Sequence, residues 1–409
     1  MLPLILGISD GWIFARLFSS FAALMTTFSK WVSCWGNATS ITDRKESTYA
    51  RDLTLRYPIR MCFSGSKIRL RFSNLTGTEP VTLTSVAVSL LRNNECAPTN
   101  SRHLTFIGNA EGVIPPGEEI LSDELPLSIE AGETLIVSIY LGEFTQMNAG
   151  TLITGPLSKG QYAYGNFADE AVLPRDLTRN TNWFYFLNTI DIFTEADNYA
   201  LICFGDSITA QSWPDYLSIR AVEEDCKHVA VIRRAVSGTR ILRQYDCITY
   251  QAYGLKGATR FPIEIDSVSG ARAVIIQHGI NDIIHPVGEA DNCFRPWSDL
   301  PTVRDLCDGV EQLYINHARA RGLSVWSGTL LPILGWRTYL PMRETMRQQF
   351  NEWLRSSSLF DGCVDFDQAV RDAADPRAFA PGFDSGDHLH PSEQAYEAMA
   401  AAVPLALLR

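Results

Sequence analysis

Hydrophobic positions in the first half of the chain follow a two-residue period. Between about Arg51 and Thr194, short segments rich in β-branched and aromatic residues are separated by turn residues. In KIRLRF, the residues Ile68, Leu70 and Phe72 alternate with basic side chains, which is typical of a strand with one face in solvent. No amphipathic helix pattern interrupts these segments, so we expect two packed antiparallel sheets in a β-sandwich or jelly roll.

After Asn198 the pattern changes to continuous apolar runs. The runs ALICF, HVAVI, RAVIIQ, LSVWSGTL and CVDF are typical of strands buried on both faces, and longer helical stretches separate them. One such helix is indicated by apolar residues at helical spacing, namely Val303, Leu306, Val310, Leu313 and Tyr314. The second half therefore predicts an α/β domain with a doubly wound parallel sheet.

A chain of 409 residues is long enough for two domains. We place the boundary in the polar stretch within residues 191–200. This divides the chain into an apolar N-terminal segment (1–30, predicted helical), a β-sandwich domain of jelly-roll type (31–195) and an α/β domain (196–409). The longest uncharged run of the N-terminal segment, Leu17 to Ser29, is shorter than the roughly 20 apolar residues that cross a bilayer, so we expect no stable membrane insertion.

Composition narrows the class of protein. With 46% hydrophobic and 20% charged residues, the chain has the composition of a globular protein rather than a disordered one. A net charge of −11 without a Lys/Arg-rich stripe disfavours nucleic-acid binding. The nine cysteines form no CxxC pair, which predicts reduced thiols and a cytoplasmic location, with export by an atypical signal as the alternative.

Polar blocks follow four of the apolar runs in the second half. Ligands of doubly wound sheets bind beyond the carboxyl ends of the strands, so these blocks are the candidate site. They are Gly205-Asp206-Ser207 after ALICF, Ser237-Gly238 after HVAVI, His278 to Asp282 after RAVIIQ, and Asp387 to His390 after CVDF and a long loop. Each block alone fits a turn or a helix cap, but their order and placement together favour catalysis.

The residue types in these blocks fit nucleophilic catalysis. Ser207 needs a base to take its proton, and His390 with Asp387 supplies a histidine and the carboxylate that orients it. An oxyanion hole can be formed by the main-chain N–H groups of Ser207 and Gly238 and the side-chain amide of Asn281. We therefore predict an acyl-enzyme mechanism that requires no cofactor.

The four blocks resemble the SGNH (GDSL-type) serine esterase/lipase family. Its markers are a Ser in a GDS block, a Gly, an Asn in a GxND block and a His in a DxxH block, which read here as Ser207, Gly238, Asn281 and, with Asp387, His390. The resemblance implies a flavodoxin-like hydrolase domain that cleaves carboxylic esters. The first half resembles the β-rich domain that precedes the hydrolase in a bacterial branch, through WVSCWGNA, RLRFSN and IPPGEEILSD.

The substrate is less well defined than the chemistry. Many relatives have Asn where this chain has Thr239, and Asp-Gly where it has Ala210-Gln211, so the pocket departs from the family pattern. The acidic balance and the lack of a long apolar lid favour a short-chain acyl or acetyl ester, such as an acetylated carbohydrate. The alternatives are a lipase or lysophospholipase and a catalytically silent carbohydrate-binding protein.

Several other residues have simpler structural interpretations. His388 and His390 beside Asp387 do not match a recognised metal-site spacing, so we expect no metal. Structural roles are expected for Cys203, Asp206, His278, Asp282 and His285. Asp365 and Asp384 are alternative candidates for the carboxylate that orients His390. Aromatic residues that line either the cleft or the core are Trp213, Tyr245, Trp297 and Trp336.

Overall fold

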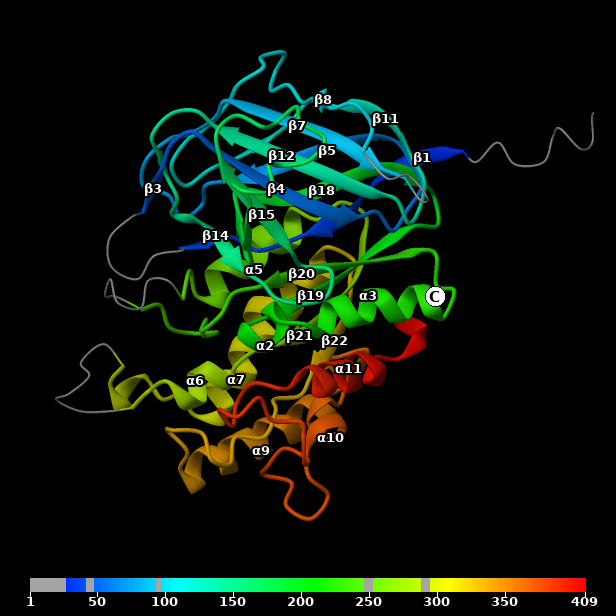
Figure 1. The fold of residues 1–409 in the computed structure, drawn as a ribbon. Coiled ribbons are helices and arrows are strands. Elements are labelled where there is room, and N and C mark those ends of the chain that lie inside the picture. Colours follow the sequence, from blue (N-terminus) through cyan, green and yellow to red (C-terminus); the bar gives the residue numbers. More distant parts are fainter. Residues whose placement is uncertain (1–26, 42–47, 93–97, 246–252, 288–294) are drawn as a thin grey trace, which may run out of the picture.

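The computed structural model describes residues 27–41, 48–92, 98–245, 253–287 and 295–409 (Figure 1). Most of the N-terminal segment that we predicted as helical, residues 1–26, lies outside this part. The helix prediction is wrong for residues 28–30, which open the first strand. Phe28 and Lys30 lie opposite Glu195 and Thr194 of another strand, so long-range pairing satisfies their backbone rather than helical bonds.

The first half of the described chain is built from antiparallel strands. Its strands are β1 (Phe28–Gly36), β2 (Ser40–Ile41), β3 (Tyr49–Ala50), β4 (Leu53–Arg60), β5 (Gly65–Ser73), β6 (Val81–Leu83), β7 (Ser85–Leu91), β8 (Arg102–His103), β9 (Gly112–Ile114), β10 (Glu119–Leu121), β11 (Leu125–Ile129), β12 (Thr134–Leu141), β13 (Thr145–Gln146), β14 (Ala149–Leu152), β15 (Gly160–Tyr164), β16 (Arg179–Thr181), β17 (Trp183–Tyr185) and β18 (Leu187–Glu195).

These strands form two larger sheets. One has the order β1-β18-β5-β10, with β11 also paired to β5, and the other has the order β16-β15-β4-β12-β7-β8. Within β5, Ile68, Leu70 and Phe72 are fully buried, whereas the basic residues between them are partly exposed. The described part of residues 51–194 contains no helix. The prediction of an antiparallel β half is therefore confirmed.

The second half contains a parallel sheet covered by helices. Its strands are β19 (Tyr199–Gly205), β20 (Val229–Ala235), β21 (Ala271–Gln277), β22 (Ser324–Gly328) and β23 (Gly362–Val364). The helices are α2 (Ser207–Ala210), α3 (Trp213–Glu223), α5 (Gly257–Asp266), α6 (Ile280–Ile284), α7 (Val303–Val310), α8 (Asn316–Ala320), α9 (Pro341–Ser356), α10 (Phe366–Val370) and α11 (Glu393–Ala402), with short 3₁₀ turns at Trp297–Asp299 and Leu405–Leu407.

The strand order β20-β19-β21-β22-β23 places the first strand of this half between its second and third. Every pairing in the sheet is parallel. This is the 2-1-3-4-5 order of flavodoxin-like doubly wound sheets, and it confirms the predicted fold class. The helix predicted from Val303 onward is present as α7, and a π-helical turn at Glu311–Ile315 joins it to α8.

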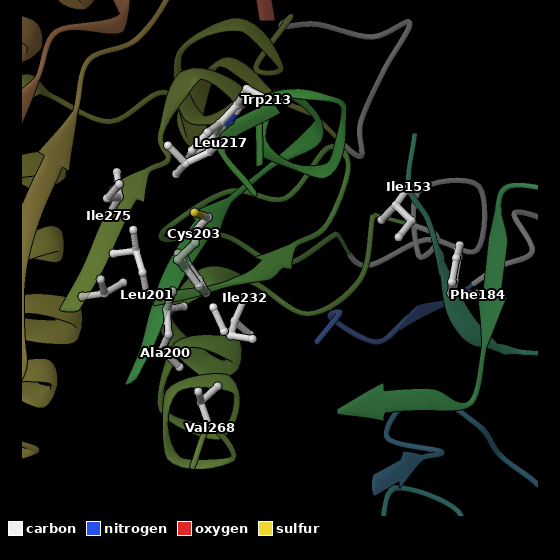
Figure 2. Packing of buried hydrophobic residues seen from close by; sticks show 14 of the residues in the cluster. Ile153, Phe184, Ala200, Leu201, Cys203, Trp213, Leu217, Ile232, Val268 and Ile275 are labelled. Atoms are coloured by element: carbon white, nitrogen blue, oxygen red, sulfur yellow. The ribbon is translucent and has the colours of Figure 1, made fainter. Parts of the chain in front are cut away.

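The strand that leads to the candidate nucleophile is buried on both faces. Every residue of β19 is buried. Figure 2 shows Cys203 beside Trp213 and Leu217 of α3, and Ala200 on the side of Val268, which follows α5. Helices on both faces explain why this segment reads as a continuous apolar run rather than an alternating one.

The two halves of the chain are joined by buried polar contacts. The last strand of the β half, β18, ends at Glu195, and β19 begins at Tyr199. The guanidinium of Arg234, on β20, donates to the carbonyl oxygens of Asn37 and Asn188 and to Thr189 Oγ1. The β half therefore packs along the edge strand of the parallel sheet, as Figure 1 shows.

Candidate active site

Ser207 lies at the carboxyl end of β19, at the first position of α2. The preceding residue, Asp206, caps this helix because its Oδ1 accepts a hydrogen bond of 3.1 Å from the main-chain N–H of Ile208. Asp206 is buried, whereas Ser207 is partly exposed. The turn therefore presents a serine hydroxyl at the strand end where ligands of such sheets bind.

His390 connects Ser207 to Asp387. His390 Nε2 lies 2.9 Å from Ser207 Oγ, and His390 Nδ1 lies 2.6 Å from Asp387 Oδ2. Because Asp387 can only accept at its ionised oxygens, Nδ1 carries the proton and Nε2 presents its lone pair to the serine. The structure thus brings together three residues that span 183 positions of sequence.

The carboxylate of Asp387 is held in its ionised form. Its Oδ1 accepts hydrogen bonds from the main-chain N–H groups of Leu389, at 3.0 Å, and His390, at 2.8 Å. Partial burial alone would raise the pKa of Asp387, but the hydrogen bonds from the His390 ring and main chain outweigh it and hold this pKa well below its usual range. The carboxylate can therefore orient His390 across the neutral pH range.

The two alternative orienters have other partners. Asp365 accepts hydrogen bonds of 2.7 and 2.9 Å from the guanidinium of Arg355. Asp384 Oδ2 lies 2.5 Å from Nδ1 of His388. The structure therefore places Asp387, and neither alternative, on His390.

The candidate oxyanion donors come from loops after neighbouring strands. Gly238 follows β20 and has a φ of +80°, a conformation that glycine adopts without a steric penalty. The amide nitrogen of Asn281, on α6, donates a hydrogen bond of 3.0 Å to the carbonyl oxygen of Thr239. A second proton on that nitrogen is left to donate elsewhere. This contact holds the GxND block against the loop that contains Gly238.

Asp282 also holds the loop that contains Gly238, through hydrogen bonds to its main chain. Its carboxylate accepts hydrogen bonds of 2.7 and 3.1 Å from the main-chain N–H groups of Ile241 and Leu242. Burial raises the pKa of Asp282 to about 6, although these hydrogen bonds and Arg240 oppose the rise. Asp282 therefore acts on the geometry of the loop, as its expected structural role implies.

His278, His285 and Cys203 lie inside the protein. The His278 ring contacts Tyr314 and Thr239, and burial lowers its pKa to about 3. His285 contacts the hydroxyl of Tyr245, and burial lowers its pKa well below the usual value. Burial raises the pKa of the Cys203 thiol, so it stays protonated.

The side chain of Thr239, where many relatives have Asn, is directed into the protein interior. The hydroxyl of Thr239 donates to the carbonyl oxygen of Val236 at 2.9 Å and lies 3.0 Å from Nε2 of His278. Its side chain is buried. The threonine therefore supports the loop rather than widening or narrowing a substrate pocket directly.

Among the four aromatic candidates, only Trp297 is clearly exposed, at 38%. Trp213 is fully buried against Phe366, and Tyr245 is buried beside His285. Trp336 is largely buried beneath the guanidinium of Arg337. These positions favour core packing for Trp213 and Tyr245.

Tyr253 is a neighbour of the site that sequence reasoning missed. A Cβ atom added to Gly238 would lie 2.0 Å from Cδ1 of the Tyr253 ring, so the ring rests directly on this glycine. The ring also stacks on His285, with centroids 5.4 Å apart. Tyr253 belongs to none of the four blocks, so no sequence signal marked it.

The described residues contain neither a cluster of metal-ligating side chains nor a membrane-spanning helix. In them, no group of three or more His, Cys, Asp or Glu residues is arranged to hold a metal ion. Within the same residues, no helix has the length and apolar character of a membrane span.

Asp206 is expected to make folding stability depend on pH. Burial raises the pKa of Asp206 to about 7. In the unfolded chain this carboxyl ionises near pH 4, so the unfolded state gains from ionisation first as the pH rises. Stability should therefore fall between about pH 4 and 7, by on the order of 4 kcal/mol from this group.

Urea unfolding of the parent and of Asp206→Asn at pH 5 and pH 8 measures this effect. In the parent, the free energy of unfolding should be lower at pH 8 than at pH 5. In Asp206→Asn this difference should be much smaller. Asp365→Asn is the matched control. Burial alone would raise the pKa of Asp365, but hydrogen bonds and the charge of Arg355 outweigh it and hold this pKa below its usual value. Equal pH dependence in the parent and Asp206→Asn would contradict the prediction.

Comparison with known proteins gives one family match and several structural matches. Residues 203–398 match the model of the GDSL-like Lipase/Acylhydrolase family. An active-site mutant of a family two carbohydrate esterase from Clostridium thermocellum matches with 13% identity, a TM-score of 0.33, and coverage of 90% of this chain and 96% of that chain. A family two carbohydrate esterase from Cellvibrio japonicus matches with 10% identity and a TM-score of 0.33, covering 92% of this chain and 97% of that chain.

An acetylxylan esterase from Geobacillus stearothermophilus matches with 17% identity and a TM-score of 0.35, covering 52% of this chain and 95% of that chain. No curated protein matches the sequence.

Proposed function

The C-terminal half of the chain belongs to the GDSL-like lipase/acylhydrolase (SGNH) family, and from this premise we propose that the protein is a serine esterase for short-chain acyl or acetyl esters, such as acetylated carbohydrates. The observation that carries the proposal is the hydrogen-bonded series from Ser207 through His390 to Asp387. This series has the order of donors and acceptors that a serine nucleophile requires.

Acylation begins at the ester carbonyl carbon. His390 Nε2 takes the proton of Ser207 Oγ as the oxygen attacks, and the carbonyl oxygen becomes an oxyanion. Asp387 stabilises the imidazolium that forms. When the tetrahedral intermediate collapses, the bond to the alcohol oxygen breaks and His390 gives its proton to that oxygen. The alcohol leaves, and the acyl group stays bound to Ser207.

Deacylation repeats these steps with water. His390 takes a proton from water as the water oxygen attacks the acyl carbon, and then returns it to Ser207 when the acyl bond breaks. The products are a carboxylic acid and the free serine. The N–H groups of Ser207 and Gly238 and the amide of Asn281 donate to the oxyanion in both halves of the reaction.

The position of the Tyr253 ring favours a substrate with a small acyl group. The ring rests on Gly238, which we assign to the oxyanion hole, and Tyr245 and His285 pack behind it. A carbonyl oxygen bound at Gly238 brings the acyl carbons close to this ring. A bulky side chain at that point limits the space for a longer chain.

Replacing the ring should change chain-length selectivity. We expect Tyr253→Ala to raise the ratio of kcat/KM for 4-nitrophenyl butyrate over the acetate by about tenfold or more, since each methylene accommodated in an apolar pocket is worth at least this factor. Tyr253→Phe keeps the ring and should retain the parental ratio. An unchanged ratio in Tyr253→Ala would show that the ring does not bound the acyl group.

The proposed function is tested with the parent protein on a series of 4-nitrophenyl esters and on acetylated xylo-oligosaccharides. We expect the highest kcat/KM for the acetate and release of acetic acid from the oligosaccharides. A preference for octanoate or longer esters would favour the lipase alternative. Binding of the oligosaccharides without hydrolysis of any ester would indicate a silent carbohydrate-binding protein.

A further inference from the structure

The loop that contains His390 holds a second aspartate–histidine pair. Asp384 Oδ2 lies 2.5 Å from Nδ1 of His388, and Asp384 Oδ1 accepts a hydrogen bond of 3.0 Å from the main-chain N–H of the same histidine. This pair takes no part in the reaction described above. Its histidine is two residues away from the base.

The backbone at His388 is strained. Its φ is +63°, in the left-handed region that disfavours residues with a Cβ atom. Gly386, two residues earlier in this loop, also has a positive φ, but it has no Cβ and adopts this conformation without the penalty. A strained non-glycine residue beside an active site points to a function for its side chain.

The His388 ring is fixed but still open to solvent. Its Nδ1 is bound to Asp384, and one face rests on Gly335, where an added Cβ atom would lie 2.7 Å from the His388 Cγ. The side chain nevertheless remains 51% exposed. With Nδ1 donating to the carboxylate, Nε2 of the neutral ring is a hydrogen-bond acceptor.

The mechanism determines which part of a substrate lies near the loop that contains His390. His390 must give its proton to the leaving alcohol oxygen, so the alcohol part of a bound ester lies next to His390. His388 precedes His390 by two residues in this loop, and its side chain is 51% exposed.

We propose that His388 is a specificity-determining residue that accepts a hydrogen bond from a free hydroxyl group on the alcohol part of the substrate. The inference rests on the proposed esterase function and deepens it. It assigns the preferred substrate class as esters of polyhydroxylated alcohols, and it gives the reason for a strained histidine at a position where glycine would fold more easily.

Two acetate esters, each with a six-membered ring in the alcohol part, test this assignment. Methyl monoacetyl-glucopyranoside has free hydroxyl groups on its six-membered ring, and cyclohexyl acetate has none. In His388→Gly, kcat/KM for the sugar ester should fall about three- to tenfold, the value of one neutral hydrogen bond, while that for cyclohexyl acetate should change by less than about twofold. The loss should appear mainly in KM, since the contact exists before and during the reaction.

Two further variants separate binding from structure. His388→Gln keeps an acceptor near the position of Nε2 and should restore part of the selectivity for the sugar ester. His103→Ala removes an exposed histidine whose Nε2 lies 2.7 Å from Asp169 in the β half, and it should leave both esters unaffected. The melting temperature of His388→Gly should equal or exceed that of the parent, because the backbone strain is relieved.

Equal losses on both esters would overturn the proposal and indicate that His388 only positions His390. Parental kcat/KM values on both esters in His388→Gly would overturn it as well. Failure of the proposed function is a different result, in which the parent protein hydrolyses neither ester.

Discussion

Ser207→Ala should reduce kcat for 4-nitrophenyl acetate by about a million-fold, because no other group can form the acyl-enzyme. The variant lacks only Oγ, which is hydrogen-bonded to His390. It should fold as the parent does, since Ser207 is partly exposed and the cap of α2 comes from Asp206. Steady-state hydrolysis and circular dichroism measure the two expectations.

Two controls give this result its meaning. Ser218→Ala removes a hydroxyl that donates to the carbonyl oxygen of Pro214 within α3, and it should keep parental activity. Asn281→Ala removes one oxyanion donor and should lose only about 100- to 1000-fold, or roughly 3 to 4 kcal/mol of transition-state stabilisation. A Ser207→Ala variant that keeps more activity than Asn281→Ala would contradict the assignment of the nucleophile.

Asp387→Asn should have the second largest effect, a loss of about 10⁴-fold in kcat. An asparagine amide in place of the carboxylate can donate to Nδ1 of His390. The ring would then carry its proton on Nε2, where it cannot accept the proton of Ser207. The measurement is kcat across a pH series, which should show the loss at every pH.

Asp365→Asn tests the alternative orienter and should retain parental kcat, because Asp365 contacts Arg355 rather than His390. If Asp365→Asn lost as much activity as Asp387→Asn, the carboxylate assignment would be wrong.

The fold was predictable from sequence because burial leaves a local pattern. β5 alternates since one of its faces meets the core, and β19 is apolar throughout since helices cover both of its faces. Strand order is less local, but a parallel sheet of alternating strands and helices has few arrangements. The family resemblance implied a flavodoxin-like domain, and the strand order of the structure agrees with that fold class.

The N-terminal helix prediction failed at residues 28–30 for a physical reason. The backbone of Phe28 and Lys30 lies opposite β18, about 165 positions away in the sequence, and no local pattern records such a partner. Apolar content alone predicts burial but does not distinguish a helix from a strand in so short a segment.

The candidate site was predictable as far as it lies in short blocks at strand ends. The structure places Ser207, His390 and Asp387 in one hydrogen-bonded series, and their catalytic roles stay a prediction. Two neighbours were outside this reasoning. Tyr253 reaches Gly238 from a loop without a motif, and the role proposed for His388 depends on a positive φ and on contacts with Asp384. Such features follow from loop geometry, which single-residue identities do not encode.

The central claim is that Ser207 is a nucleophile activated by His390. Treatment with a fluorophosphonate, followed by mass spectrometry of the digested protein, tests it most directly, because only an activated serine forms the adduct. We expect one adduct per chain, on Ser207, and none in His390→Ala. An adduct on another residue, or full labelling of Ser207 in His390→Ala, would contradict the claim.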